Sequence, residues 1–274
     1  MTTIQAIILG IIQGLTEFLP VSSSGHLVLF SRLFKVQEPS LIFEVMVHVG
    51  TLLAVLVVFR SEVLLLFRSF LALLQNPKDA KQQMEQDPGS RLLLALVLGT
   101  IPAVLAALLF KDQIEGLFSS SLFVGFMLLA TGTILYLTER LSGAKQRLET
   151  MTLKDAVLIG LGQAVAMVPG ISRSGTTIAA GLVRGLDRES AARFSFLLAI
   201  PAILGALVLS IGDLFSGAAQ IGWGVMGAGF VAAALTGYVA IHFLLDLVKR
   251  GKLVWFSYYT WAIGALVILL HVVS

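Results

Sequence analysis

The chain has 274 residues, of which 57% are apolar and 13% are charged, and its mean hydropathy is +0.93. This composition excludes a soluble globular protein and predicts an integral membrane protein. The net charge of +3 indicates no nucleic-acid partner, because basic loops on one side of a bilayer account for it. The absence of cysteine excludes disulfides, thiolate metal ligands and a cysteine nucleophile.

The first predicted element is a broken helix, GIIQGLTEFLPVSSSGH, which runs from Gly10 to His26. An apolar half-helix reaches Pro20, and a Ser/Gly-rich turn leads into a second short helix over 26–35. That second helix would be about 15 Å long, too short to cross a bilayer. We therefore expect residues 1–35 to form a re-entrant hairpin. A removable signal peptide is not expected, since no basic region precedes a small-residue cleavage site.

Apolar runs long enough to cross a bilayer follow along the chain. They predict six spanning helices, at 41–59, 92–110, 120–138, 194–212, 223–248 and 253–273. The extended polar stretch at 75–90 is predicted to be a cytoplasmic loop rather than a separate domain.

A second copy of the broken helix, GLGQAVAMVPGISRSGTT, runs from Gly160 to Thr177, before the fourth apolar run. A repeated broken helix is a sequence indicator of a binding site at the membrane midplane. The matched residues are Gly10 with Gly160, Gln13 with Gln163, Ser22 with Ser172, Ser24 with Ser174, and Gly25 with Gly175.

The distribution of Lys and Arg favours a re-entrant second copy. If residues 153–188 return to their own side, only Arg32, Lys35 and Lys111 lie on the outer face, and Arg173 lies inside the hairpin. If they cross instead, the basic residues divide evenly between the faces, against the positive-inside rule. The predicted cytoplasmic residues are Arg60, Arg68, Lys78, Lys81, Arg91, Arg140, Lys145, Arg147, Lys154, Arg184, Arg188, Arg193, Lys249, Arg250 and Lys252.

The predicted fold is therefore an all-α polytopic membrane protein with one membrane domain, 1–274. It has six spanning helices plus two re-entrant helical hairpins arranged as an inverted repeat, about 1–140 and about 150–274. The first hairpin opens outward and the second opens to the cytoplasm. Their Ser/Gly-rich tips are expected to meet near the middle of the bilayer.

Glu17 lies one helical turn after Gln13, so both side chains face the same way. A carboxylate at membrane depth costs a few kcal/mol and indicates function by default, the alternative being a residue near a wet helix end. The functional interpretation is a ligand for a hard cation such as Mg²⁺ or Ca²⁺. Gln13 would be a neutral oxygen ligand or an orienting group.

The turn after Pro20 predicts an anion site. Ser22, Ser23, Ser24 and Gly25 precede a helix, so the serines are candidate N-caps, and the free backbone N–H groups of that helix favour an anion. His26 in the first turn is a candidate proton carrier or nucleophile on phosphorus.

Arg173 in the second copy offers a planar fork suited to phosphate oxygens. An ion pair between Arg173 and Glu17 is a second interpretation, compatible with the first. Metal, anion donors, hydroxyl and imidazole together suit phosphoryl transfer. The flanking candidates for substrate binding are Ser172, Ser174, Gly175, Thr176 and Thr177.

Other polar residues carry weaker indications. Glu44 and His48, at i and i+4, either line the outward cavity or form buried hydrogen bonds. Snorkelling or loop contacts account for Arg193, His242 and Asp246 near the basic face.

The segments QGLTEFLPVSSSGH (13–26) and PGISRSGTT (169–177) resemble those of the bacterial undecaprenyl-diphosphate phosphatases linked to bacitracin resistance. The resemblance covers essentially the whole chain. It implies a bacterial plasma-membrane hydrolase that removes the terminal phosphate of undecaprenyl diphosphate and regenerates the lipid carrier for peptidoglycan synthesis. It also implies a divalent metal and an active site that faces outward.

Carried over by motif, the resemblance implies that Glu17 is the essential acidic residue and that Arg173 clamps phosphate. Ser23 and His26 are the implied nucleophile and base, although attack by His26 itself or by an activated water stays open. This chain has Gln13 where some members have glutamate, which leaves one carboxylate fewer for a metal.

The main alternative is a lipid or ion transporter, because broken helices in inverted repeats are a transporter architecture. The unrelated acid-phosphatase-like membrane family also has a Ser-Gly-His motif, but its later Ser-Arg segment carries a downstream histidine that is missing soon after Arg173 here. The expected partners are a polyprenyl diphosphate lipid and the bilayer, and a homodimer is compatible with the sequence.

Overall fold

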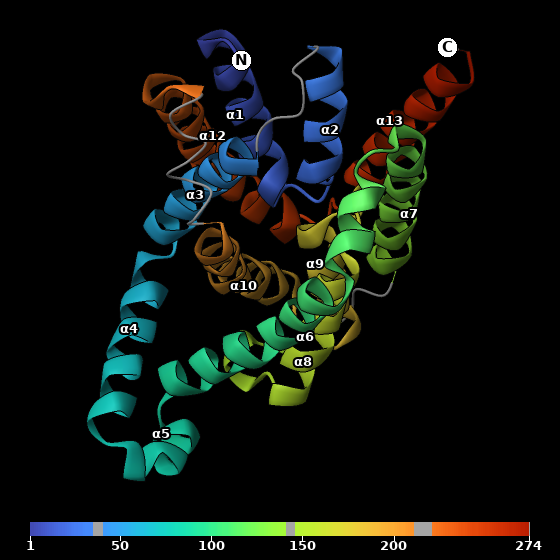
Figure 1. Ribbon diagram of the computed structural model, residues 1–274. Helices are drawn as coiled ribbons and strands as arrows, with labels where there is room; N and C mark the ends of the chain where they lie inside the picture. The colour runs from blue at the N-terminus through green and yellow to red at the C-terminus, as the bar shows by residue number, and fades with distance from the viewer. Residues whose placement is uncertain (35–40, 141–145, 211–220, 274) are drawn as a thin grey trace.

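The computed structural model describes residues 1–34, 41–140, 146–210 and 221–273. In these ranges the regular structure is helical apart from one isolated bridge between Gln146 and Leu186 (Figure 1). The helices are α1 (Thr3–Phe18), α2 (Ser23–Leu33), α3 (Leu41–Val58), α4 (Arg60–Gln75), η1 (Pro77–Asp79), α5 (Ala80–Gln86), α6 (Pro88–Leu117), α7 (Ser121–Glu139), η2 (Leu148–Thr150), α8 (Leu153–Val165), α9 (Arg173–Val183), α10 (Arg188–Leu209), α12 (Trp223–Lys249) and α13 (Val254–Val273).

Five of the described helices are long and apolar enough to cross a membrane: α6, α7, α10, α12 and α13. Helices α3 and α4 give a sixth candidate span if they are taken together, although the chain bends by 90° between them. The prediction of a polytopic all-helical membrane protein is confirmed at this level. The apolar run at 194–212 continues into 211–212, which lie outside the described residues.

The segment between the first two apolar runs is more ordered than the sequence predicts. Residues 60–75 form α4, and the polar stretch 75–90 contains η1, α5 and the start of α6. In Figure 1, α4 and α5 lie at the opposite end of the molecule from the free ends of α1 and α2. Asp87 starts α6 as its N-cap, since its side chain accepts a hydrogen bond from the Ser90 amide.

Each copy of the broken motif forms two helices joined by a short loop, and the two copies use the same cap. The Ser22 hydroxyl accepts from the Gly25 amide at 3.2 Å to start α2, and the Ser172 hydroxyl accepts from the Gly175 amide at 3.1 Å to start α9. The loops differ at the cap itself. Ser22 has φ of 70°, whereas Ser172 has φ of −74°. A positive φ is uncommon for serine, so the first loop holds a strained backbone that the second does not share at this position.

Matched glycines let each first half-helix pack closely on a long helix. A Cβ atom on Gly10 would lie 2.3 Å from the Gly229 carbonyl oxygen, so α1 rests directly on the backbone of α12. A Cβ atom on Gly160 would lie 2.2 Å from the Gly99 carbonyl oxygen, so α8 rests in the same way on α6. Small residues at such contacts are typical of helices packed in membranes.

The two loops touch each other. A Cβ atom on Gly25 would lie 3.3 Å from Gly170 Cα in the second loop, and one on Gly175 would lie 3.2 Å from Pro20 Cβ in the first. The Ser174 hydroxyl also donates to the Leu19 carbonyl at 3.2 Å. The expectation that the two tips meet agrees with these contacts.

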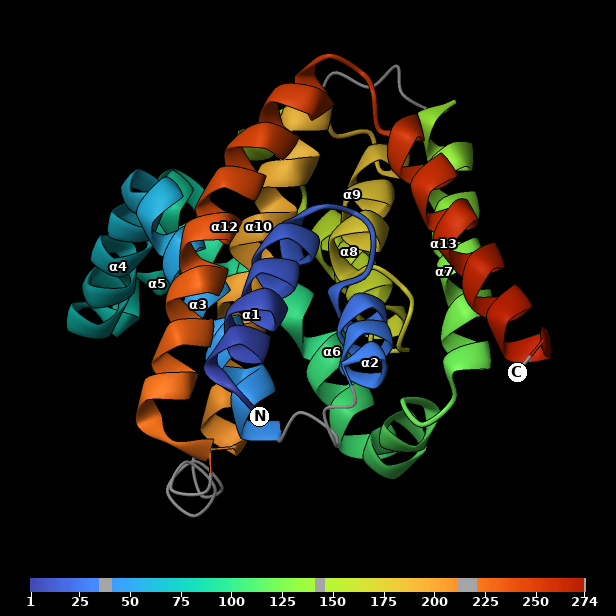
Figure 2. The same ribbon diagram turned by 90° about the horizontal axis from the view of Figure 1, so that it is seen from above.

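Helices α7 and α13 lie side by side next to the loops (Figure 2). On α7, the Thr131 hydroxyl donates to the Gly170 carbonyl at 2.9 Å and accepts from the Ser172 amide at 3.1 Å. This single hydroxyl is the hydrogen-bond partner of two buried backbone groups of the second loop. The loop backbone is not helical there, so these groups need a partner from outside the loop.

Candidate active site

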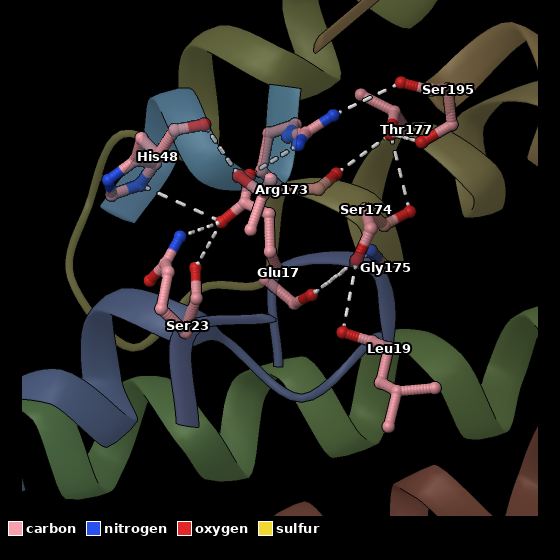
Figure 3. A network of polar contacts seen from close by, with 12 residues as sticks. Glu17, Leu19, Ser23, His48, Arg173, Ser174, Gly175, Thr177 and Ser195 are labelled. Atoms are coloured by element: carbon pink, nitrogen blue, oxygen red, sulfur yellow. Dashed lines mark hydrogen bonds and ion pairs between the residues drawn. The ribbon is translucent and has the colours of Figure 1, made fainter. Parts of the chain in front are cut away.

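Glu17 is the centre of a buried polar network at the contact between the two loops (Figure 3). It lies in the last turn of α1, and its side chain is 6% exposed. One carboxylate oxygen, Oε2, accepts from Gln13 Nε2 at 2.8 Å and from Ser23 Oγ at 2.7 Å. The other, Oε1, accepts from Arg173 Nη2 at 2.6 Å. The predicted acid, hydroxyl and arginine therefore meet around one carboxylate.

Arg173 reaches this carboxylate from the first residue of α9, in the other hairpin. Its Nη1 donates to the Ser195 carbonyl of α10 at 3.1 Å, which holds the plane of the guanidinium. The Ser195 hydroxyl lies 2.6 Å from the Thr177 hydroxyl, one turn further along α9. The ion pair considered as a second interpretation is therefore present. A charge-assisted bond from arginine to a buried carboxylate is among the stronger polar contacts in proteins.

His48 of α3 also faces Glu17. Its Nε2 lies 3.7 Å from Glu17 Oε2, and its Nδ1 lies 2.7 Å from the Glu44 carbonyl oxygen. The sequence left open whether this residue lines a cavity or is buried, and its side chain is 32% exposed. His48 is therefore the more accessible imidazole beside the carboxylate.

His26 is buried between the first loop and α13. It is 2% exposed, its Nδ1 lies 2.8 Å from the Ser22 carbonyl oxygen, and its Nε2 lies 2.8 Å from the Tyr259 hydroxyl of α13. The Ser23 hydroxyl donates to Glu17, and in the described part of the chain it makes no hydrogen bond to His26. The serine and histidine thus belong to neighbouring but separate contacts.

The remaining predicted substrate-binding residues lie at the starts of α2 and α9, directly after the two loops. The Ser22 and Ser24 hydroxyls are 3.3 Å apart, and the Ser172 and Ser174 hydroxyls are 3.2 Å apart, so the pairing repeats in both copies. In the first turn of α9, Thr176 Oγ1 donates to the Ser172 carbonyl at 2.6 Å. The serines at the caps carry out the structural role that serine commonly has there.

Gln13 and Glu17 are the residues that could hold a divalent cation. Among the described residues, no group of three or more His, Asp or Glu side chains could enclose a metal. However, Gln13 Oε1 is buried next to Glu17 without a hydrogen-bond partner. A buried amide oxygen beside one carboxylate suits Mg²⁺ or Ca²⁺, since Mg²⁺ in particular is bound by one or two carboxylates together with waters and phosphate oxygens.

A cavity of about 660 Å³ between α6, α8 and α10 leads to Arg173. Its wall is almost wholly apolar and includes Ala103, Met167 and Gly205. Gln163, the match of Gln13, also lines it, is 3% exposed, and has neither amide atom hydrogen-bonded.

Three features of the site escaped sequence analysis: Tyr259, Ser195 and the contact of His48 with Glu17. Tyr259 and Ser195 come from helices far along the chain, and neither lies in a motif. The i, i+4 spacing of Glu44 and His48 within an apolar run was the one available indication for His48.

Comparison with known proteins agrees with the two motifs. A model of the family described as bacitracin resistance protein BacA matches residues 6–266. Proteins named undecaprenyl-diphosphatase are similar over nearly their whole length. The one from Carboxydothermus hydrogenoformans is 45% identical over 274 residues, 99% of this chain and 98% of that protein. The one from Methanobrevibacter smithii is 46% identical over 97% of each chain, and undecaprenyl-diphosphatase 3 of Bacillus cereus is 43% identical over 99% of this chain and 98% of its own. With the motifs, the helical membrane fold and these relatives in agreement, the chain belongs to the bacitracin resistance protein BacA family.

Proposed function

We propose that this protein hydrolyses undecaprenyl diphosphate to undecaprenyl phosphate and inorganic phosphate. The reaction recycles the lipid carrier for peptidoglycan and other envelope polymers and confers resistance to bacitracin. The observation that carries the proposal is the Glu17 carboxylate, which binds Ser23 from its own hairpin and Arg173 from the other. The names of the relatives support the same substrate.

The proposed setting is the bacterial plasma membrane, with six spans and two re-entrant hairpins in an inverted repeat. The matched packing of Gly10 on α12 and of Gly160 on α6 supports this arrangement, because each hairpin then rests on a helix of the other repeat. The positive-inside rule supports an active site that faces outward and basic loops in the cytoplasm.

In the proposed reaction, Arg173 and the backbone N–H groups at the start of α2 and α9 hold the diphosphate oxygens. The attacking oxygen comes from Ser23 or from a water near it. It forms a bond to the terminal phosphorus while the bond from that phosphorus to the bridging oxygen breaks, and undecaprenyl phosphate leaves with the bridging oxygen. If Ser23 attacks, water then hydrolyses the phosphoserine and releases inorganic phosphate.

His26 is the proposed acceptor of the proton from the attacking group. A divalent cation held by Glu17, Gln13 and the diphosphate would neutralise phosphate charge.

Phosphate release from the purified protein in detergent, with undecaprenyl diphosphate as substrate, tests this function. We expect release to stop in EDTA and to return when Mg²⁺ or Ca²⁺ is added. Full turnover in EDTA would contradict the cation site at Glu17 and Gln13. No release under any condition would contradict the enzyme itself and favour transport, which requires a sealed vesicle with two compartments.

The isoprenoid chain of the substrate is proposed to lie in the apolar cavity beside Arg173. Gly205 lines this cavity, and a Cβ atom added there would meet nothing within 4 Å. We therefore expect Gly205→Phe to fold and to fill the cavity. It should raise KM for undecaprenyl diphosphate about tenfold, equivalent to about 1.4 kcal/mol of lost lipid contact. KM for a short-chain isoprenoid diphosphate should change little.

Gly227→Phe on α12 is the matched control, because a Cβ atom there also meets nothing within 4 Å and Gly227 does not line the cavity. Equal kinetics in the two variants would show that the lipid chain lies elsewhere.

A further inference from the structure

Both ring nitrogens of His26 are occupied, and the two partners define the state of the ring. A carbonyl oxygen can only accept, so the Ser22 carbonyl, 2.8 Å from Nδ1, requires the proton of the neutral ring to be on Nδ1. The lone pair is then on Nε2, which accepts from the Tyr259 hydroxyl at 2.8 Å. The Ser22 carbonyl selects the tautomer, and the tyrosine hydroxyl occupies the Nε2 lone pair.

The second loop shows which of these contacts belongs to the loop fold. Thr176 occupies the place of His26, and its hydroxyl donates to the Ser172 carbonyl, the same bond to the carbonyl four residues earlier. The threonine side chain ends there. Histidine adds a second nitrogen that extends beyond the loop to α13. The contact with Tyr259 is therefore an addition to a shared loop structure.

Tyr259 is well placed to hold this nitrogen, because α13 is packed closely on α7. A Cβ atom on Gly264 would lie 2.7 Å from the Gly125 carbonyl oxygen, and Trp261 Nε1 donates to the Leu129 carbonyl at 3.1 Å. The rings of His26 and Tyr259 are nearly parallel, with an interplanar angle of 7° and centroids 5.7 Å apart. The helix pair that holds the second loop through Thr131 therefore also holds His26 of the first.

We propose that Tyr259 is a proton relay to His26 in the phosphatase reaction. Its hydroxyl proton already occupies the Nε2 lone pair, so the proton of the attacking group passes to the Tyr259 oxygen while the Tyr259 proton passes to Nε2. His26 is 2% exposed and Tyr259 is 43% exposed, so the tyrosine is the more accessible of the two. This inference rests on the proposed function, with His26 as the final proton acceptor. A group that transfers a proton in the transition state contributes about 100- to 10,000-fold to the rate.

The test compares Tyr259→Phe with Tyr258→Phe, its neighbour on α13. The Tyr258 ring contacts Trp255 and Trp261 rather than His26. We expect Tyr259→Phe to lower kcat about 100-fold or more and to leave KM within about twofold, because the phenol is not a phosphate ligand in the proposed reaction. Tyr258→Phe should keep wild-type kinetics. An unchanged kcat in Tyr259→Phe, or a raised KM with unchanged kcat, would overturn the proposal.

A second readout does not depend on activity. In protein labelled with ¹⁵N in its histidine rings, and with His26→Gln used for assignment, the wild-type Nε2 of His26 should give the resonance of a hydrogen-bonded acceptor. Tyr259→Phe should shift that resonance and Tyr258→Phe should not. A protonated Nε2 in the neutral wild-type ring, or no shift in Tyr259→Phe, would overturn the contact. If the wild type releases no phosphate, the proposed function fails while these resonances still decide whether Tyr259 holds His26.

Discussion

Glu17→Gln is expected to abolish phosphate release from the purified, folded protein, with a loss of about 100- to 10,000-fold in kcat. Glutamine has the same shape as glutamate but carries an NH₂ group in place of one carboxylate oxygen. Glu17 accepts from Arg173 on one oxygen and from Gln13 and Ser23 on the other. In either orientation, the new NH₂ group faces a donor that has lost its acceptor. The substitution also removes the negative charge that we propose binds the cation.

Glu115→Gln is the matched control, since Glu115 lies near the C-terminal end of α6 with its side chain 63% exposed and pairs only with Lys111 in the described residues. It should retain wild-type turnover. Circular dichroism and size-exclusion profiles would establish that both variants are folded. Near-normal phosphate release by folded Glu17→Gln would refute the central role of this carboxylate.

Arg173→Ala is the second substitution for which we expect a large loss, here of both turnover and stability. The guanidinium joins Glu17 of the first hairpin to Ser195 of α10. Its removal leaves the Glu17 carboxylate buried without the positively charged side chain that pairs with it. Breaking a buried ion pair on one side costs about 3–5 kcal/mol. Turnover should be abolished, because the site also loses the guanidinium N–H groups that we propose bind the phosphate oxygens.

The double variant Glu17→Gln with Arg173→Ala separates these two effects. It should recover much of the stability lost in Arg173→Ala, because no unpaired carboxylate remains, yet stay inactive. Arg184→Ala is the control on the same hairpin. Arg184 pairs with Asp155 at the far end of α9, its side chain is 40% exposed, and its loss should leave turnover unchanged. Thermal unfolding and phosphate release measure the two quantities. Full turnover by Arg173→Ala would contradict the phosphate clamp.

The sequence was most informative where the chain departs from a regular apolar helix. Glu17 and Arg173 are charged residues beside breaks in apolar helices; the cost of burying a charge in a membrane marked Glu17 as a functional candidate, and an ion pair with Glu17 was one of two interpretations of Arg173. The serines after Pro20 were predicted as N-caps, and the structure has the matching cap at Ser172 in the second copy. Composition and apolar runs likewise predicted the helical membrane fold.

The unpredicted features depend on contacts between distant segments. Tyr259 lies 233 positions after His26, in a helix whose aromatic residues are equally typical of a membrane surface. The bend between α3 and α4 lies next to Phe59, without the proline or glycine that usually marks a kink. The division of Ser23 and His26 between different partners depends on the backbone of the first loop, where Ser22 adopts a positive φ that a sequence motif does not specify.

The close packing of α1 on α12 has a consequence for biosynthesis. A chain is made from its N-terminus, so α1 (Thr3–Phe18) leaves the ribosome long before α12, which begins at Trp223. The glycine face of α1 therefore lacks its final neighbour until most of the protein has been translated. By contrast, α8 finds α6 already inserted when it emerges from the ribosome. The candidate active site needs both hairpins, so it cannot form before α9, which begins at Arg173, has been made.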